Sequence, residues 1–220
     1  MVGASGNGKR ETIKSLEKAS GKTSHTKIFD EFEMVICQHH QTKLSLYHGV
    51  NVVEHNATEE GASQQANLVM ENWKVGFNAI ALVIYVSNLF QGLTNPLNLL
   101  MHAFGKKTVR DYGICIVTGA DEFENRMRRM YGPRGKEFLR WCEEQEGHIK
   151  EFLDVFSPNR IILFDIDMNK EEYERQLLQV LQCVDNLPEM NVKYTYDTHR
   201  EEKDVTQVRL LVFTFCFIYS

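Results

Sequence analysis

The sequence predicts an α/β domain: a doubly wound, mostly parallel sheet with helices on both faces. Three mainly apolar runs, at residues 79–86, 112–118 and 160–166, are typical of strands buried on both faces of a parallel sheet. Patterns with helical spacing separate these runs. Strands that alternate with helices indicate a doubly wound sheet, on which ligands bind at the carboxyl ends of the strands.

The first half of the chain contains four further predicted elements. Residues 11–19 follow a glycine-rich start and have a helical pattern. Residues 45–53 are rich in β-branched side chains, which favours a strand. Residues 61–73 carry apolar residues at helical spacing, and residues 96–105 predict a helix with Pro near its start and Gly at its end.

The second half adds two amphipathic helices. The apolar spacing predicts one helix over residues 136–156 and a second over residues 170–187, where apolar residues recur at i, i+3, i+4 and i+7. The connecting loops are expected at residues 20–27, 125–135 and 187–191.

The composition excludes several classes of protein. The formal net charge of −5 and the absence of a strongly basic run argue against nucleic acid as a partner. The apolar run at residues 210–219 is shorter than the roughly 20 residues that a membrane-spanning helix needs, so a membrane partner is not expected. The five cysteines are scattered without a C-x-x-C pair, and no signal peptide is visible, so we expect a cytoplasmic location.

The start of the chain resembles a phosphate-binding loop of the pattern G-x-x-x-x-G-K, with Gly3, Gly8 and Lys9 in the required positions. Such a loop wraps backbone N–H groups around phosphates at a helix N-terminus, and its lysine reaches the terminal phosphates. A flexible glycine-rich terminus is the alternative explanation. The candidate phosphate-binding residues are Gly3, Ala4, Ser5, Gly6, Asn7, Gly8, Lys9, Arg10 and Glu11.

Both ends of the chain raise questions. A phosphate-binding loop connects a strand to a helix, yet only Met1 and Val2 precede Gly3. We expect a truncated first strand; a fold that lacks this strand is the alternative. We assign residues 1–200 to the domain and residues 201–220 to an apolar tail. A tail strand, a partner-binding tail and a spurious extension all remain open, and the last is favoured.

A second motif follows the predicted strand at residues 112–118. Thr118 and Asp121 form the pattern Thr-x-x-Asp. An aspartate here could accept hydrogen bonds from N1–H and the N2 amine of guanine, which adenine does not present. Taken alone the pattern is weak, because an aspartate in this position is more often a helix cap.

Together these motifs resemble those of the GTPases of immunity-associated proteins, which carry the AIG-type G domain. The similar stretches are GASGNGKRETIKSL at the phosphate-binding loop, FGKKTVRDYGICIVTGADEF before the guanine motif and WCEEQEGHIKEFLDVFSPNRIILFD around the last strand. The resemblance covers about residues 1–200 and implies a P-loop G domain. It implies that Thr118 and Asp121 bind guanine and that Asp165 and Ile166 line the base pocket, where the family often has Asn in place of Ile166.

The sequence also departs from the family pattern. Arg10 replaces the Ser or Thr whose hydroxyl binds magnesium, and Glu54 stands near the family's metal-linked Asp. Ala57 replaces the glycine that senses the γ-phosphate, and residues 86–94 lack the family's arginine. We therefore expect an incomplete magnesium site with Glu54 as its candidate ligand. The Arg10 guanidinium could occupy the metal position or could point into solvent.

The resemblance implies a protein that binds GTP or GDP and is at most a weak GTPase, because phosphoryl transfer depends on the metal. A nucleotide-free pseudo-GTPase that serves as an interaction or structural module is the alternative. Family members associate through the nucleotide-binding face, so the resemblance also implies a homodimer.

Overall fold

A computed structural model gives the fold. It describes the backbone of residues 9–19, 22–29, 32–39, 42–48, 58–72, 76–90, 95–165, 170–188 and 210–215. Side chains are described for residues 11–19, 58–71, 76–90, 97–165 and 171–188.

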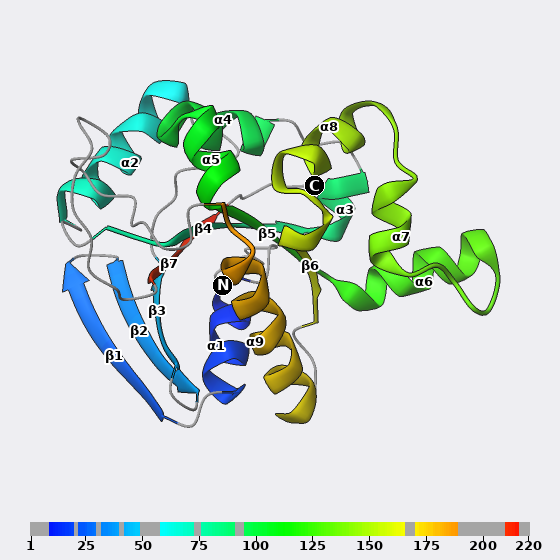
Figure 1. Cartoon of the computed structure of the whole chain (residues 1–220), viewed down its shortest axis with the longest axis horizontal. Coiled ribbons are helices and arrows are strands. Elements are labelled where there is room, and N and C mark those ends of the chain that lie inside the picture. Colours follow the sequence, from blue (N-terminus) through cyan, green and yellow to red (C-terminus); the bar gives the residue numbers. More distant parts are fainter. Residues whose placement is uncertain are drawn as a thin grey trace, which may run out of the picture.

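The described strands form one seven-stranded sheet in the order β1-β2-β3-β7-β4-β5-β6 (Figure 1). Strands β3, β7, β4, β5 and β6 are parallel, and the hairpin-linked β1 and β2 add an antiparallel edge. This arrangement confirms the predicted mostly parallel sheet. The strands are β1 Lys22–Phe29, β2 Phe32–His39, β3 Thr42–His48, β4 Ala79–Tyr85, β5 Gly113–Thr118, β6 Ile161–Phe164 and β7 Leu210–Phe215.

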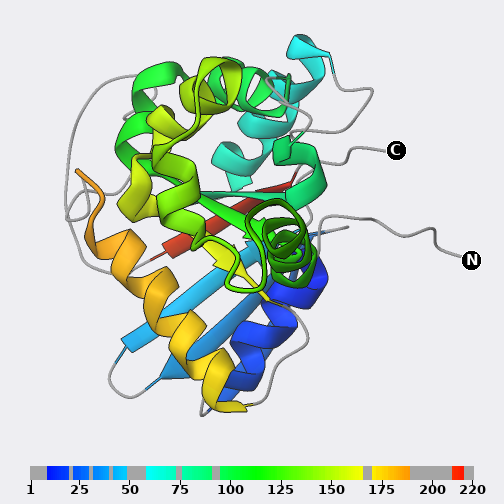
Figure 2. The same cartoon turned by 90° about the vertical axis from the view of Figure 1, so that its right-hand side faces the viewer.

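Helices cover both faces of the sheet, which confirms the doubly wound arrangement (Figures 1 and 2). Helices α1 and α9 lie side by side on one face, and α2 to α8 pack around the other. The helices are α1 Lys9–Ala19, α2 Glu59–Asn72, α3 Val86–Phe90, α4 Asn95–Phe104, α5 Lys106–Tyr112, α6 Ala120–Tyr131, α7 Phe138–Glu143, α8 Gly147–Phe156 and α9 Lys170–Asp185, with a 3₁₀ turn at Pro158–Arg160.

Strand β4 shows why these residues form the centre of the sheet. Its side chains alternate between two apolar clusters: Ile80, Leu82 and Ile84 pack with α2 to α8, whereas Ala79, Ala81 and Val83 pack with α1 and α9. A strand buried on both faces needs apolar residues at every position, which is the pattern that the sequence predicts.

Three predictions about secondary structure were wrong. Most of the loop expected at residues 20–27 is strand β1, which is polar and pairs with β2 alone, so it lacks the two-sided apolar pattern. Most of the loop expected at residues 125–135 is helix α6, whose charged surface hides a narrow buried stripe of Phe123 and Met127. The single helix expected at residues 136–156 is two helices, because the chain turns at Gly147 with φ +62°.

Strand β2 was not predicted, and strand β3 starts before the expected residues 45–53; residues 49–53 lie outside the described residues. Helices α3 and α5 were not predicted either, whereas α1, α2, α4, α9, β4, β5 and β6 lie within a few residues of the predicted positions. The expectation of a truncated first strand concerns residues 1–8, which lie outside the described residues. Residues 189–191 of the loop expected at residues 187–191 also lie outside them.

Residues 210–215, in the segment whose role the sequence left open, form strand β7 in the middle of the sheet. Leu210 pairs with Ser45 of β3, and Leu211 pairs with Ala79 of β4. Among the described strands, β7 alone joins the β1-β2-β3 half to the β4-β5-β6 half.

The buried Arg160 side chain links several elements at the amino ends of the parallel strands. The Arg160 side chain is only 6% exposed. Its Nη1 donates to the carbonyls of Arg110 and Gly113, and its Nη2 donates to the carbonyl of Val155 at 3.3 Å and to Ser157 Oγ at 3.4 Å. Burial lowers the pKa of Arg160 from its ordinary value. Arg160 therefore links the ends of α5 and α8 to the start of β5.

Replacing Arg160 with Met should destabilise the domain by about 2–4 kcal/mol, because buried carbonyl groups lose their donors while the apolar stem is retained. Urea unfolding measures this loss. The matched control is Arg140→Met, since the Arg140 side chain is 73% exposed and lies 3.6 Å from Glu144. Equal, small losses for the two variants would contradict the role of Arg160.

Candidate functional site

The carboxyl ends of β4, β5 and β6 meet at one edge of the sheet. Tyr85, Thr118 and Phe164 form a single row there, because Tyr85 pairs with Thr118 and Thr118 pairs with Phe164. Ligands of doubly wound domains bind at this edge. The structure therefore brings two of the predicted guanine-binding residues, Thr118 and Asp165, to the ends of neighbouring strands.

Thr118 is fully buried, and its Oγ1 donates a hydrogen bond to the carbonyl of Ile84 at 3.3 Å. The hydroxyl thus ties the end of β5 to the end of β4. This hydrogen bond fixes the backbone at the carboxyl edge of the sheet.

Gly119 makes the turn from β5 into α6. Its backbone is left-handed, with φ +85° and ψ +45°, and it is the N-cap of α6. A Cβ added here would lie 2.7 Å from Cε2 of Tyr85. The Tyr85 ring therefore packs directly against the turn, and only glycine satisfies both the backbone conformation and the space.

Asp121 and Glu122 lie in the first turn of α6 and have different surroundings. Asp121 is exposed, and because Gly119 is the N-cap, Asp121 is not the helix cap. Glu122 is half-buried and lies beside the Tyr85 hydroxyl. Burial and the neighbouring carboxylates of Glu122 and Asp121 raise the pKa of Tyr85 to about 12, so Tyr85 remains protonated at neutral pH.

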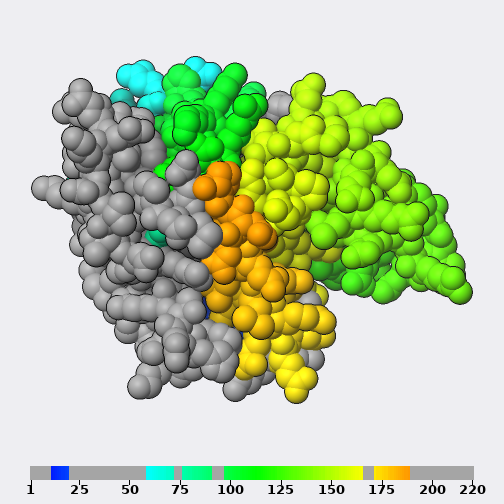
Figure 3. Space-filling view, in the orientation of Figure 1, coloured from blue at the N-terminus to red at the C-terminus, as the bar shows by residue number. Residues whose placement is uncertain are grey.

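An aromatic cluster holds α6 in place beside this edge. Phe123 of α6 stacks on Phe90 of α3 at 6.2 Å and meets Phe138 and Trp141 of α7 edge-on at 5.1 and 5.7 Å. The Arg126 guanidinium lies 4.0 Å from the centre of the Phe90 ring. These contacts anchor α6 at its first turns, whereas the far end of α6 extends into the lobe on the right of Figure 3.

Asp165 directly follows β6 and is partly buried. In the orientation that satisfies both of its polar groups, the Gln176 amide donates to the Asp165 carbonyl at 3.0 Å and accepts from the Asp165 N–H at 2.8 Å. Gln176 is 3% exposed and belongs to α9.

The sequence did not reveal Tyr85, Glu122 and Gln176 as site residues, because no motif marks them. Ile166 lies outside the described residues.

The predicted phosphate-binding residues are described only in part. Lys9 and Arg10 begin α1, Glu11 is exposed in its first turn, and Gly3, Ala4, Ser5, Gly6, Asn7 and Gly8 lie outside the described residues, as does Glu54. Helix α1 packs along α9, where Lys18 Nζ lies 3.4 Å from the Tyr173 hydroxyl and 5.0 Å from the centre of its ring.

Two kinds of feature are absent from the described part of the chain. Its side chains form no group of three or more His, Cys, Asp or Glu residues that could hold a metal ion. None of its helices is both long and apolar enough to cross a membrane.

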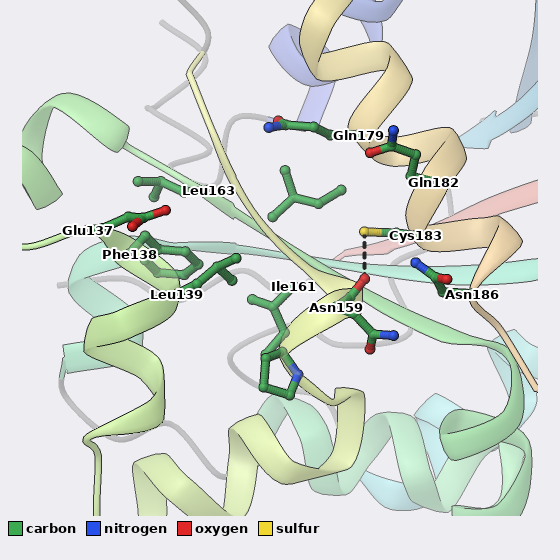
Figure 4. Close-up of a pocket in the computed structure, with 12 residues that line it drawn as sticks. Glu137, Phe138, Leu139, Asn159, Ile161, Leu163, Gln179, Gln182, Cys183 and Asn186 are labelled. Atoms are coloured by element: carbon green, nitrogen blue, oxygen red, sulfur yellow. Dashed lines mark hydrogen bonds between the residues drawn. The ribbon is translucent and has the colours of Figure 1, made fainter.

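A groove of about 400 Å³ runs along β6 between α7 and α9 (Figure 4). Its lining contains none of the predicted nucleotide-binding residues. Cys183 lines it and donates to the carbonyl of Asn159 at 3.3 Å, and burial raises the pKa of this thiol to about 12. The thiol is therefore protonated at neutral pH and is no nucleophile.

The turn at Gly119 yields a prediction. Gly119→Ala should cost about 1–2 kcal/mol in backbone strain, plus about 1–3 kcal/mol because the new methyl group displaces the Tyr85 ring. Gly147→Ala is the matched control: Gly147 has φ +62°, and a Cβ added there would meet nothing within 4 Å. Urea unfolding of both variants separates strain from crowding. An equal loss would show that the contact with Tyr85 is unimportant.

The comparisons with known proteins agree with this geometry. The chain matches the model of the AIG1 family over residues 1–211. No curated protein matches the sequence. The family match covers nearly the whole chain and agrees with an α/β domain whose parallel strands end at one edge. The chain therefore belongs to the AIG1 family, the family of the immunity-associated, GTP-binding type of G domain.

Proposed function

We propose that this domain binds GTP or GDP, with guanine at the carboxyl edge of β5 and β6 and phosphates at the start of α1. The observation that carries the proposal is the convergence of the turn at Thr118–Asp121 and the Asp165 backbone on neighbouring strands of an AIG1-family domain. The first turn of α1 supplies backbone N–H groups of the kind that bind phosphate.

Asp121 is the residue to which we assign base recognition. Its carboxylate is exposed at the start of a helix that the Phe123 cluster anchors, whereas the neighbouring carboxylate, Glu122, is half-buried beside Tyr85. A fixed, exposed carboxylate suits the two donors on the guanine edge. Adenine offers no such pair, and a carboxylate left unpaired against it would cost about 1–3 kcal/mol.

At the phosphates, we assign Lys9 to the terminal oxygens and Arg10 to the place of the family's magnesium-binding hydroxyl. A bound magnesium ion would offset negative charge on the phosphates during transfer. Arg10 cannot serve as a metal ligand, because a guanidinium has donors and no acceptor. The residue set therefore does not fit a complete magnesium site, and we expect at most weak hydrolysis.

The family resemblance also supports a homodimer through the nucleotide-binding face, and the scattered cysteines support a reducing, cytoplasmic location. A nucleotide-free pseudo-GTPase, acting as an interaction or structural module, is the competing function. Arg10 favours it, whereas the anchored edge at Asp121 favours retained base recognition. The nucleotide content of the purified protein, released by denaturation and separated by chromatography, distinguishes the two.

Base selectivity is directly testable. The unmodified protein should bind GDP at least tenfold more tightly than ADP, and Asp121→Asn should reduce this ratio to near one, because the amide cannot accept both guanine donors. Titration calorimetry with both nucleotides measures the ratio. Asp154→Asn, which removes an exposed carboxylate paired with Lys150 on α8, should leave it unchanged. Equal binding of GDP and ADP by the unmodified protein would refute the assignment.

Metal dependence tests the role of Arg10. GDP affinity should change less than twofold on addition of EDTA, because a permanent cation replaces the metal through charge-assisted hydrogen bonds. Arg10→Ser restores the family residue and should restore a dependence on magnesium if Glu54 holds a water of the ion. A tenfold loss of affinity in the unmodified protein on chelation, about 1.4 kcal/mol, would place the Arg10 side chain in solvent instead.

A further inference from the structure

Gln176 holds the end of β6 from outside the sheet. Both bonds of its amide go to a single residue, to the carbonyl of Asp165 at 3.0 Å and to its N–H at 2.8 Å. A neighbouring strand would bind the edge of β6 with the same pair of donor and acceptor. Among the described strands β6 pairs with β5 alone, and the Gln176 amide adds one donor and one acceptor to the Asp165 backbone from α9.

The amide is well placed to fix a backbone position. Gln176 is 3% exposed, so water does not compete for its hydrogen bonds. The next residue, Leu177, and Tyr173 one turn earlier are both buried against the sheet and α1. The Gln176 side chain therefore extends from a helix that is anchored on both sides of it.

The same part of α9 also contacts the helix that follows the phosphate-binding loop. Lys18 of α1 donates a hydrogen bond to the Tyr173 hydroxyl and makes a cation–π contact with the Tyr173 ring. Tyr173 and Gln176 lie three positions apart and so lie near one face of α9. One helix face thus connects α1 to the end of β6.

We propose that Gln176 is a positioning residue for the base half of the nucleotide site: it fixes the backbone of Asp165 at the end of β6. The assignment rests on the proposed function, in which Asp165 and Ile166 line the guanine pocket. In this proposal Gln176, on α9, does not contact the nucleotide. It sets the backbone geometry of Asp165, which does.

Gln176→Leu tests this role, because leucine fills similar space without an amide. The variant should bind GDP at least tenfold more weakly, whereas its affinity for pyrophosphate, which contacts only the phosphate half, should stay within twofold. Loss of both affinities together would mean a general structural defect and would overturn the proposal. Gln179→Leu, the same substitution at an exposed position one turn later on α9, should change neither affinity.

A second readout needs no nucleotide. In the free protein, hydrogen exchange followed by NMR should show a protected Asp165 amide, and Gln176→Leu should remove that protection while the Leu163 amide in β6 remains unchanged. If Gln176→Leu fails to fold, Gln176→Glu is measured instead. It keeps the acceptor for the Asp165 N–H but loses the donor at neutral pH, so it should retain amide protection and bind GDP with intermediate affinity.

The outcomes separate the two proposals. If the unmodified protein binds pyrophosphate but not GDP, base recognition fails, and the exchange experiment alone decides whether Gln176 holds Asp165. If the unmodified protein prefers GDP but Gln176→Leu matches Gln179→Leu in affinity and in exchange, Gln176 has no positioning role.

Discussion

The structure depends on the burial of β4 and β5 on both faces. Every residue of β5 is buried, and β4 is buried up to Tyr85. Two parallel strands without a solvent face require helices above and below them. The positions of α1, α9 and the opposing helices follow from this requirement. The polar groups that these two strands can offer to a ligand lie at the strand ends, so we expect the binding site there.

The two ends of the strands are built differently. At the amino ends, Arg160 satisfies carbonyl groups from several elements and is itself buried, which suits a permanent structural role. At the carboxyl ends, a glycine turn, a tyrosine that remains protonated and an amide from α9 hold backbone in place while leaving Asp121 exposed. Fixed backbone next to an exposed carboxylate is the arrangement that a selective binding site needs.

The sequence could predict the central strands and most helices because each has a pattern that burial imposes. Strand β1 escaped prediction because an edge strand needs no apolar run, and α6 escaped it because its charged residues dominate its composition. In the site, Thr118 and Asp121 belong to a local motif, so spacing along the chain finds them. Tyr85 and Gln176 act through contacts between residues far apart in the sequence, namely Tyr85 with Glu122 and Gln176 with Asp165, and no local pattern encodes those.

The central place of β7 has a consequence for how the chain reaches this fold during synthesis. Leu210 pairs with Ser45 and Leu211 with Ala79, so its partners leave the ribosome long before β7 does. Until then the facing edges of β3 and β4 have no neighbour, and open strand edges are templates for association with other chains. Contacts that span so much of the chain also form slowly. A nascent chain of this protein therefore exposes the facing edges of β3 and β4 until β7 has been synthesised, and during that time association with other chains competes with folding.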